Sequence, residues 1–206
     1  MTVLSHILEH KLVAIIRGMP ATDTVAIAEA LYAGGIRNLE VTLNSPDALQ
    51  VIARLADVFK NRMQVGAGTV ITTADAANAI DAGATFLVSP SLDEGVIKAA
   101  NKAGVVSIPG ALTPTEIVAA HHYGADIIKV FPCPDVGYLK AILAPLNHIR
   151  MMPTGGVDAY NIKAYETAGA VAFGIGSALV NNRETIDEAY LEELTIKAIK
   201  LIAALI

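Results

Sequence analysis

Eight short apolar runs recur along the chain at intervals of about 20 to 26 residues. Most are rich in valine, isoleucine and leucine, as expected for strands that are buried on both faces of a parallel sheet. Alanine-rich segments with helical spacing separate several of them. The runs begin at Leu12, Asn38, Gln64, Thr85, Val105, Asp126, Ile149 and Val171. The helical segments cover residues 24–33, 46–59, 74–82, 94–103 and 114–122. This alternation predicts an α/β fold, a closed (βα)8 TIM barrel.

Residues typical of helix ends support the same division. A glycine stands just before several of the runs, and we expect each of these glycines to end a helix in the left-handed conformation. The glycines are Gly34, Gly83, Gly104, Gly124 and Gly169. Helix starts are predicted at Ser45-Pro46, at Thr113-Pro114 and at Asp158, where a capping side chain or a first-turn proline is available.

The whole chain, residues 1–206, is predicted to form one barrel domain. Residues 2–10 are expected to form a short helix that closes the bottom of the barrel, and residues 186–206 an amphipathic last helix. The alternative fold is an open, doubly wound sheet. That fold commonly carries a complete dinucleotide-binding fingerprint after a strand. Two segments begin such a fingerprint but lack its final glycine or alanine: Gly66-Ala67-Gly68 and Gly174-Ile175-Gly176.

Composition excludes several classes of protein. With 53% hydrophobic residues the chain is not disordered, and a net charge of −5 without tryptophan argues against a nucleic-acid partner. The longest stretch without a charged residue, Thr167–Asn182, contains three glycines and is too short to span a membrane. No signal peptide is evident, and the single cysteine, Cys133, fits a reducing compartment. We therefore expect a cytoplasmic protein with no membrane partner.

Polar residues and glycines gather where the predicted strands end, which is where barrel enzymes place their chemistry. Lys129 lies inside an apolar run, and burial of an ammonium favours the neutral amine that forms Schiff bases with ketones. The alternative is a lysine that extends its amine to solvent or pairs with a carboxylate. Glu40 is similarly placed in the second run, either as the counter-ion of Lys129 or as a general acid and base.

An anion site is predicted after the last two runs. Thr154, Gly155 and Gly156 follow the seventh run, and Gly176 and Ser177 follow the eighth. Glycines let backbone amides approach phosphate oxygens, and the start of a following helix adds a favourable dipole. The alternative is that these glycines only make tight turns.

Arg17 ends the first run, and its guanidinium suits a substrate carboxylate. The alternative is an exposed loop arginine.

Other motifs carry weaker hypotheses. His6 and His10 flank Glu9 with the spacing of a zinc peptidase, but they lie at the wrong end of the barrel and lack a third ligand. His121 and His122 are adjacent and are expected at the surface. Cys133 has no evident histidine partner, so a nucleophilic role is not favoured. We predict no metal site.

Seven short motifs in order, from about Leu12 to Leu179, resemble the KDPG/KHG aldolases, the 2-keto-3-deoxy-6-phosphogluconate aldolase family. The motifs are Leu39-Glu40-Val41-Thr42-Leu43, Gly66-Ala67-Gly68-Thr69-Val70, Val88-Ser89-Pro90, Ile108-Pro109-Gly110, Lys129-Val130-Phe131-Pro132, Pro153-Thr154-Gly155-Gly156-Val157 and Gly174-Ile175-Gly176-Ser177. The resemblance implies a class I, metal-independent aldolase without a cofactor, commonly a homotrimer. Its implied substrate is a small phosphorylated keto acid, cleaved to pyruvate and glyceraldehyde 3-phosphate, with 4-hydroxy-2-oxoglutarate as a side substrate.

The resemblance also implies a role for each matching residue. Lys129 matches the Schiff-base lysine and Glu40 the general acid and base. Residues near the pyruvate and the rest of the substrate are Thr69, Pro109, Gly110, Phe131 and Thr154. The phosphate cradle corresponds to Gly155, Gly156, Gly176 and Ser177.

This chain departs from the family pattern at two places. It has Asn44 where many members carry the arginine that binds the carboxylate, so Arg17 is expected to take that role. The sequences around Arg17 and Asn44 look more like the galactonate-specific branch. The loop of residues 131–140 also differs, which bears on the choice of aldehyde. Two other functions stay open: a phosphosugar isomerase or epimerase that uses Lys129 and Glu40 without a covalent bond, and a barrel that binds phosphometabolites without turnover.

Overall fold

Strands and helices alternate along the computed structural model, which describes residues 1–181 and 186–206. The strands are β1 (Leu12–Ile16), β2 (Asn38–Thr42), β3 (Gln64–Gly68), β4 (Phe86–Val88), β5 (Val106–Ile108), β6 (Gly110–Ala111), β7 (Ile128–Val130), β8 (Met151–Pro153) and β9 (Phe173–Ile175). The helices are α1 (Val3–His10), α2 (Thr24–Ala33), α3 (Ala48–Val58), α4 (Thr73–Asp81), α5 (Glu94–Ala103), α6 (Pro114–His122), α7 (Val136–Leu143), α8 (Ile162–Ala168) and α9 (Glu188–Ala203). Each of the eight predicted runs therefore contains a strand.

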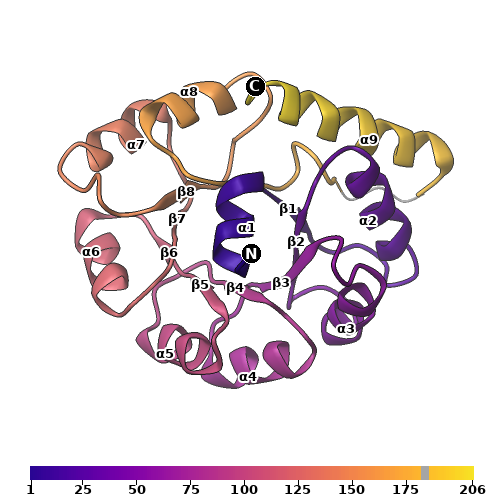
Figure 1. The fold of residues 1–206 in the computed structure, drawn as a ribbon, viewed down its shortest axis with the longest axis horizontal. Helices are drawn as coiled ribbons and strands as arrows, with labels where there is room; N and C mark the ends of the chain where they lie inside the picture. Colours follow the sequence, from indigo (N-terminus) through magenta and orange to yellow (C-terminus); the bar gives the residue numbers. More distant parts are fainter. Residues whose placement is uncertain (182–185) are drawn as a thin grey trace.

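The strands are parallel and form two sheets, ordered β5-β4-β3-β2-β1-β9 and β6-β7-β8. Figure 1 shows them as a curved wall around α1, with the other helices on the outside. A curved parallel α/β architecture is thus confirmed, whereas one closed ladder of eight strands is not recorded. Between β8 and β9, the described residues form a single bridge, which joins Thr154 and Gly174.

The fifth predicted strand is divided at Pro109. β5 pairs with β4, whereas β6 pairs with β7. Proline has no N–H to donate to a ladder, so the chain changes its hydrogen-bonding neighbour at this residue. The Pro109 carbonyl still accepts a bond from the Lys129 amide at 2.9 Å.

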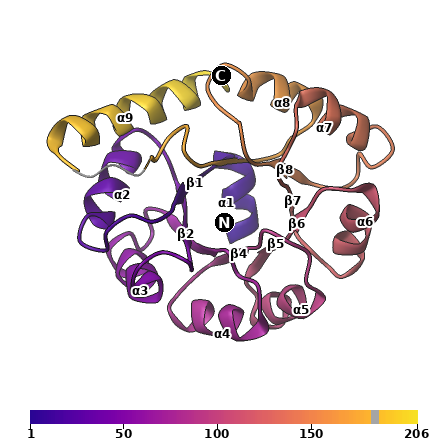
Figure 2. The same ribbon diagram turned by 180° about the vertical axis from the view of Figure 1, so that it is seen from behind.

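Helix α1 covers the amino ends of the strands, as predicted for the head segment. His6 Nδ1 lies 3.0 Å from Asn38 Oδ1, and Asn38 Nδ2 donates to the Leu12 carbonyl at 3.0 Å. Ile7 is fully buried against an inner cluster that includes Val13 and Phe86. The same arrangement is seen from behind in Figure 2. Because α1 fills the amino end, access to the interior must come from the carboxyl ends of the strands.

Successive strand residues point alternately inward and outward. Leu39 and Val41 of β2 belong to the outer cluster that packs against the helices, so Glu40 between them faces inward. Ile127 belongs to the inner cluster, and Lys129 two residues later faces the same way. The two charged residues singled out in the sequence therefore share the interior.

Several predicted helix ends differ from those observed. Gly83, Gly104, Gly124 and Gly169 have the expected positive φ. Gly34 does not, and its neighbour Gly35 takes the left-handed conformation instead. The N-cap of α3 is Asp47 rather than Ser45, and that of α8 is Asn161 rather than Asp158. Thr113 caps α6 with Pro114 in the first turn, as predicted.

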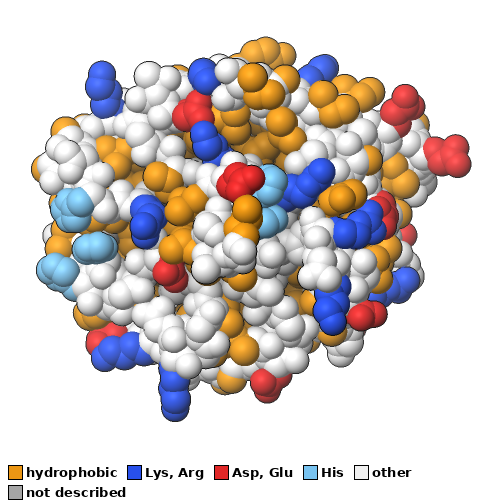
Figure 3. Space-filling model, in the orientation of Figure 1, with side chains coloured by type: hydrophobic (Ala, Val, Ile, Leu, Met, Phe, Trp, Pro, Cys, Tyr) orange, Lys and Arg blue, Asp and Glu red, His pale blue; other side chains and the backbone are white. Residues whose placement is uncertain are grey.

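The last helix, α9, buries Tyr190, Leu194, Ala198 and Leu201, whereas Ile196 and Ile199 of its apolar sequence remain exposed. Among the described residues, no helix is long and apolar enough to cross a bilayer. On the face seen in Figure 3, lysine and arginine side chains are scattered among acidic and apolar ones.

Candidate active site

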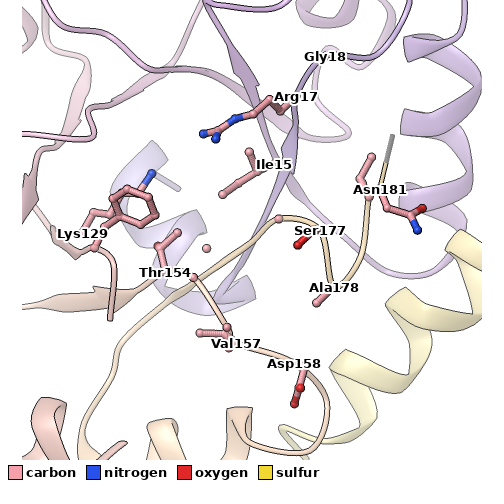
Figure 4. Close-up of a pocket in the computed structure, with 16 residues that line it drawn as sticks. Ile15, Arg17, Gly18, Lys129, Thr154, Val157, Asp158, Ser177, Ala178 and Asn181 are labelled. Atoms are coloured by element: carbon pink, nitrogen blue, oxygen red, sulfur yellow. The ribbon is translucent and has the colours of Figure 1, made fainter. Parts of the chain in front are cut away.

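A cavity of about 510 Å³ opens at the carboxyl ends of β1, β7, β8 and β9 (Figure 4). Most of the residues singled out in the sequence line it. They are Arg17, Lys129, Phe131, Thr154, Gly155, Gly156, Gly176 and Ser177. Their convergence from four separate strand ends explains why the polar residues follow strands rather than clustering along the chain.

Lys129 lies on β7 and is only 3% exposed. Its Nζ lies 4.9 Å from the ring centroid of Phe131, which is a cation–π distance. Within the described residues, Lys129 forms no ion pair at 4.0 Å or less. The interpretation that Lys129 and Glu40 form a structural ion pair is therefore wrong: among the described residues no carboxylate lies within 4.0 Å of the amine, which faces the cavity.

Glu40 lies on β2 and is fully buried. Neither carboxylate oxygen has a hydrogen-bond partner among the described residues. An unpartnered buried carboxylate costs several kcal/mol of folding free energy in general, so such a group is retained for a purpose other than stability. Glu40 pairs in register with Ile15 of β1, which lines the cavity.

Thr69, Pro109 and Gly110 are not among the residues that line the cavity. Gly110 is the register partner of Lys129 on the adjacent strand, and Pro109 accepts the Lys129 backbone bond. Both thus lie beside the backbone of the lysine. Thr69 follows β3 directly and has a φ of 59°, a left-handed conformation that is unusual for a β-branched residue.

Arg17 is exposed at the end of β1, and its guanidinium is directed into the cavity, toward Lys129 (Figure 4). In the described part of the chain it forms neither an ion pair nor a hydrogen bond through its side chain. The next residue is tied to the neighbouring loop, because the Gly18 amide donates to Ser45 Oγ at 2.9 Å. Ser45 Oγ also lies 2.9 Å from Thr42 Oγ1. The sequence pointed to Ser45 only as a helix cap.

The loops after β8 and β9 carry the predicted anion site. Gly155 and Gly156 have φ values of 89° and 73°. Across residues 1–181 and 186–206, the backbone amides of Gly156 and Ser177 donate no hydrogen bond. No helix follows these glycines at once: α8 begins at Ile162, and residues after Gly176 form a turn in which Leu179 and Val180 donate back to its carbonyl. The expected helix dipoles are thus replaced by free loop amides.

The side chains of Asp158 and Asn161, just before α8, form hydrogen bonds with the backbone of residues 156–161. Asp158 Oδ1 accepts from the amides of Tyr160 and Asn161 at 2.8 and 3.1 Å. Asn161 Oδ1 accepts from the Asp158 amide at 2.9 Å, and Asn161 Nδ2 donates to the Gly156 carbonyl at 2.7 Å. The sequence indicated only Asp158, as a cap. Asn161 was not indicated by the sequence, because no residue pattern specifies its bond to the Gly156 carbonyl.

The loop after β7 is held at the mouth by Tyr138, whose hydroxyl donates to the Leu112 carbonyl. Cys133 in this loop is buried, and burial raises the pKa of its thiol. Burial also raises the pKa of the nearby Tyr165 hydroxyl to about 12. Cys133 is therefore held as a neutral thiol, which agrees with the expectation that it is not a nucleophile.

The histidines lie away from the cavity. The rings of His6 and His10 on α1 lie tilted to each other with centroids 4.4 Å apart, and His121, His122 and His148 lie at the surface near α6. Across the described part of the chain, no three His, Cys, Asp or Glu side chains are placed to hold a metal ion.

Comparison with known proteins places this cavity in a family. A family model described as KDPG and KHG aldolase matches residues 3–196. The chain belongs to this family. Its members are class I aldolases, lyases that work through a Schiff base. The sequence-based prediction of a class I aldolase is thereby confirmed, and it is favoured over an isomerase or a binding protein without turnover.

Two relatives and one solved structure illustrate the match. The chain is 36% identical over 175 residues to a probable 2-dehydro-3-deoxy-6-phosphogalactonate aldolase of Rhizobium meliloti, covering 84% of this chain and 82% of that protein. It is 38% identical over 159 residues to the KHG/KDPG aldolase of Escherichia coli, covering 76% and 74%. The KDPG aldolase of Legionella pneumophila, solved with pyruvate captured as a covalent carbinolamine, aligns with a TM-score of 0.86 at 29% identity, covering 97% and 98%.

Proposed function

We propose that this aldolase cleaves a 2-keto-3-deoxy-6-phospho sugar acid, the gluconate or its galactonate epimer, into pyruvate and glyceraldehyde 3-phosphate. The observation that carries the proposal is the buried, unpaired amine of Lys129 facing a cavity lined by Arg17 and by free backbone amides. Relatives named for both epimers support the substrate class.

Lys129 is the covalent catalyst in this proposal. Its amine attacks the C2 ketone to give a carbinolamine, which loses water and leaves an iminium ion. When the C3–C4 bond breaks, its electron pair moves toward the iminium nitrogen and forms an enamine, while the aldehyde half departs. Protonation of the enamine at C3 and hydrolysis then release pyruvate and return the free amine.

Glu40 supplies the proton transfers. It removes the proton of the C4 hydroxyl as the C3–C4 bond breaks and serves carbinolamine formation and dehydration. The absence of a hydrogen-bond partner for either carboxylate oxygen among the described residues leaves both available for the substrate and for water. Thr69, Pro109 and Gly110 would then lie near the pyruvate carbons.

The two charged ends of the substrate need separate anchors. Arg17 is proposed to bind the carboxylate, since its guanidinium is directed toward Lys129, next to which the C1 carboxylate must lie. Gly155, Gly156, Gly176 and Ser177 would hold the phosphate through backbone amides and the Ser177 hydroxyl. Phe131 and Thr154 would flank the carbon chain between the two ends.

The same proposal covers the architecture of the protein, its assembly, its location in the cell and a side activity. The two sheets would complete a (βα)8 barrel, with residues 1–206 as one domain, and the chain would act as a cytoplasmic homotrimer without metal or cofactor. Activity on 4-hydroxy-2-oxoglutarate would be a side activity. The single Thr154–Gly174 bridge and the continuity of β5 and β6 across Pro109 support the barrel.

The test is trapping with pyruvate and sodium borohydride, followed by intact-mass analysis and peptide mapping. A reduced pyruvate adduct is expected on Lys129 and not in Lys129→Ala. Lys140→Ala, which removes an exposed lysine of α7, is the matched control and is expected to keep the adduct. A folded protein that gives no adduct would overturn the proposal in favour of a phosphosugar isomerase or epimerase.

A second assay addresses the C4 configuration. Pyruvate release from the gluconate and galactonate substrates at equal concentrations gives the ratio of the two kcat/KM values. A ratio above about tenfold would assign the enzyme to the gluconate-specific or the galactonate-specific branch of the family. If the enzyme turned over neither epimer, this substrate class would be excluded.

A further inference from the structure

Gly156, in the loop after β8, has little packing around it. Two successive residues with positive φ have wide conformational freedom, and a β-carbon at Gly156 would touch nothing within 4 Å. Gly156 is also exposed. Packing therefore does not fix the direction of its peptide groups, and another interaction must.

The Asn161 side chain provides that interaction. Its Nδ2 donates to the Gly156 carbonyl at 2.7 Å, while its Oδ1 accepts from the Asp158 amide at 2.9 Å. Both polar atoms of one side chain thus bond the backbone on either side of Val157. Val157 itself is buried and packs in the outer cluster, which fixes the middle of the segment.

Holding one carbonyl orients a neighbouring amide. A trans peptide is planar, and its C=O and N–H groups point in opposite directions. With the Gly156 carbonyl bonded to Asn161, the Val157 amide must point away from Asn161. Val157 lines the cavity, and across the described residues its amide donates no hydrogen bond.

The same set of bonds turns a negative charge out of the cavity. Asp158 lines the cavity, and an ionised carboxylate there would repel an anionic substrate. Its Oδ1 instead accepts from the amides of Tyr160 and Asn161, and Figure 4 shows the carboxylate directed away from Lys129 and Arg17. The acidic side chain thus serves the start of α8 rather than facing the ligand.

We propose that Asn161 is a positioning residue for the phosphate end of the substrate. It does not touch the ligand. It holds the peptide between Gly156 and Val157 so that the Val157 amide is directed at the phosphate before the substrate arrives, which lowers the entropy lost on binding. This inference rests on the proposed function, because it presupposes a phosphorylated substrate in this cavity.

The chain contains a matched control for this bond. Asn101 Nδ2 donates to the carbonyl of Gly124 at 3.0 Å, and Gly124 also has a positive φ. This pair links α5 to the end of α6, and neither residue lines the cavity. Asn101→Ala therefore removes the same type of hydrogen bond without touching the proposed phosphate loop.

The experiment compares wild type, Asn161→Ala and Asn101→Ala on a phosphorylated substrate and on its dephosphorylated form. For Asn161→Ala we expect KM for the phosphorylated substrate to rise about tenfold, with kcat and the kcat/KM for the dephosphorylated form changed less than about twofold. Inorganic phosphate should inhibit this variant about tenfold more weakly. Asn101→Ala should match wild type in each assay.

Different results would bear on different claims. Equal KM values for wild type and Asn161→Ala, with a normal Lys129 adduct in both, would overturn the positioning role and leave the aldolase proposal intact. Absence of the adduct in wild type would overturn the proposed function instead. A wild type that does not prefer the phosphorylated substrate would overturn the phosphate loop and this inference together.

A second variant covers the case in which Asn161→Ala fails to fold. Asn161→Asp keeps the acceptor for the Asp158 amide but loses the donor to the Gly156 carbonyl. It is expected to show the same rise in KM and the same unchanged pyruvate adduct. Wild-type KM in a folded Asn161→Asp would contradict the inference.

Discussion

The carboxylate of Glu40 occupies the space that a β-carbon at Gly68 would require. Gly68 ends β3, and its register partner is Thr42, two residues beyond Glu40 on β2. The glutamate therefore leans toward the carboxyl end of the sheet, over the neighbouring strand. Gly68 does not have a positive φ, so its role is to leave room rather than to make a turn.

This relationship predicts the effect of adding one methyl group. Gly68→Ala should displace the Glu40 carboxylate and lower kcat by about 100-fold, because a displacement of about 1 Å can cost that much in a proton-transfer step. Steady-state kinetics would measure the loss. Gly137→Ala, in helix α7, adds the same methyl group away from Glu40 and should leave kcat unchanged.

Removing the charge of Glu40 gives a complementary result. Glu40→Gln keeps the shape but not the base, so kcat should fall by about 10²- to 10⁴-fold. Because the wild-type carboxylate is buried and unpartnered among the described residues, the same change should raise the midpoint of thermal unfolding. A variant that loses both activity and stability would indicate that Glu40 has a structural partner.

Arg17 has a specific predicted kinetic signature. If it binds the substrate carboxylate, Arg17→Ala should raise KM by about 10- to 100-fold and alter kcat much less, since the interaction exists in the ground state. Arg54→Ala removes an exposed arginine of α3 and serves as the control. An unchanged KM for Arg17→Ala would discard the assignment.

Acid stability should depend on Glu166. Bonds from Lys11 and then Lys163 lower the pKa of this carboxyl below its ordinary value of 4.5. A carboxyl with a lowered folded-state pKa stabilises the protein above the unfolded pKa, and that stabilisation is lost as the pH falls through the folded value. The partly exposed ion pairs should contribute about 0.5 to 1 kcal/mol at pH 7.

Urea unfolding of wild type and Glu166→Gln at several pH values between about 7 and 3 would check this. The two should differ at neutral pH and converge in acid. Glu192→Gln, an exposed glutamate of α9, is expected to behave as wild type throughout. A difference between wild type and Glu166→Gln that persists at pH 3 would contradict the assignment.

The strands were predictable because their environment is uniform. A strand covered on both faces must be apolar along its length, so the eight runs stand out in the sequence, and the inward glutamate and lysine stand out against them. The division at Pro109 was not predictable, because it depends on which neighbour each half of the run pairs with. The order of pairing is set by how the strands are arranged around the two sheets, not by the composition of the run.

The residues of the site differ in the same way. Lys129 and Glu40 could be predicted because burying a charged side chain in an apolar strand costs free energy, which indicates a functional role. The contact of Glu40 with Gly68 could not, since it depends on the register between β2 and β3. Asn161 was overlooked because its importance lies in one bond to the Gly156 carbonyl, which no residue pattern specifies.

The exchange of roles between Gly34 and Gly35 leads to a last prediction. Gly34 was expected to be left-handed, but it has a φ of −76°, which any residue can adopt. Its small size is required instead by α9: a β-carbon at Gly34 would lie 2.5 Å from the Ala198 β-carbon and 2.8 Å from the Thr195 carbonyl oxygen. Helices α2 and α9 thus meet closely at this point.

Gly34→Ala should therefore destabilise the protein by about 1 to 3 kcal/mol, as overpacking does in a well-packed interface. The free energy of unfolding in urea would measure the loss. Ala198→Gly removes one of the two opposing groups, so the double variant should recover part of the loss relative to the sum of the single changes. Strict additivity of the two variants would show that the helices separate to accept the methyl group, and that Gly34 is not a contact point between α2 and α9.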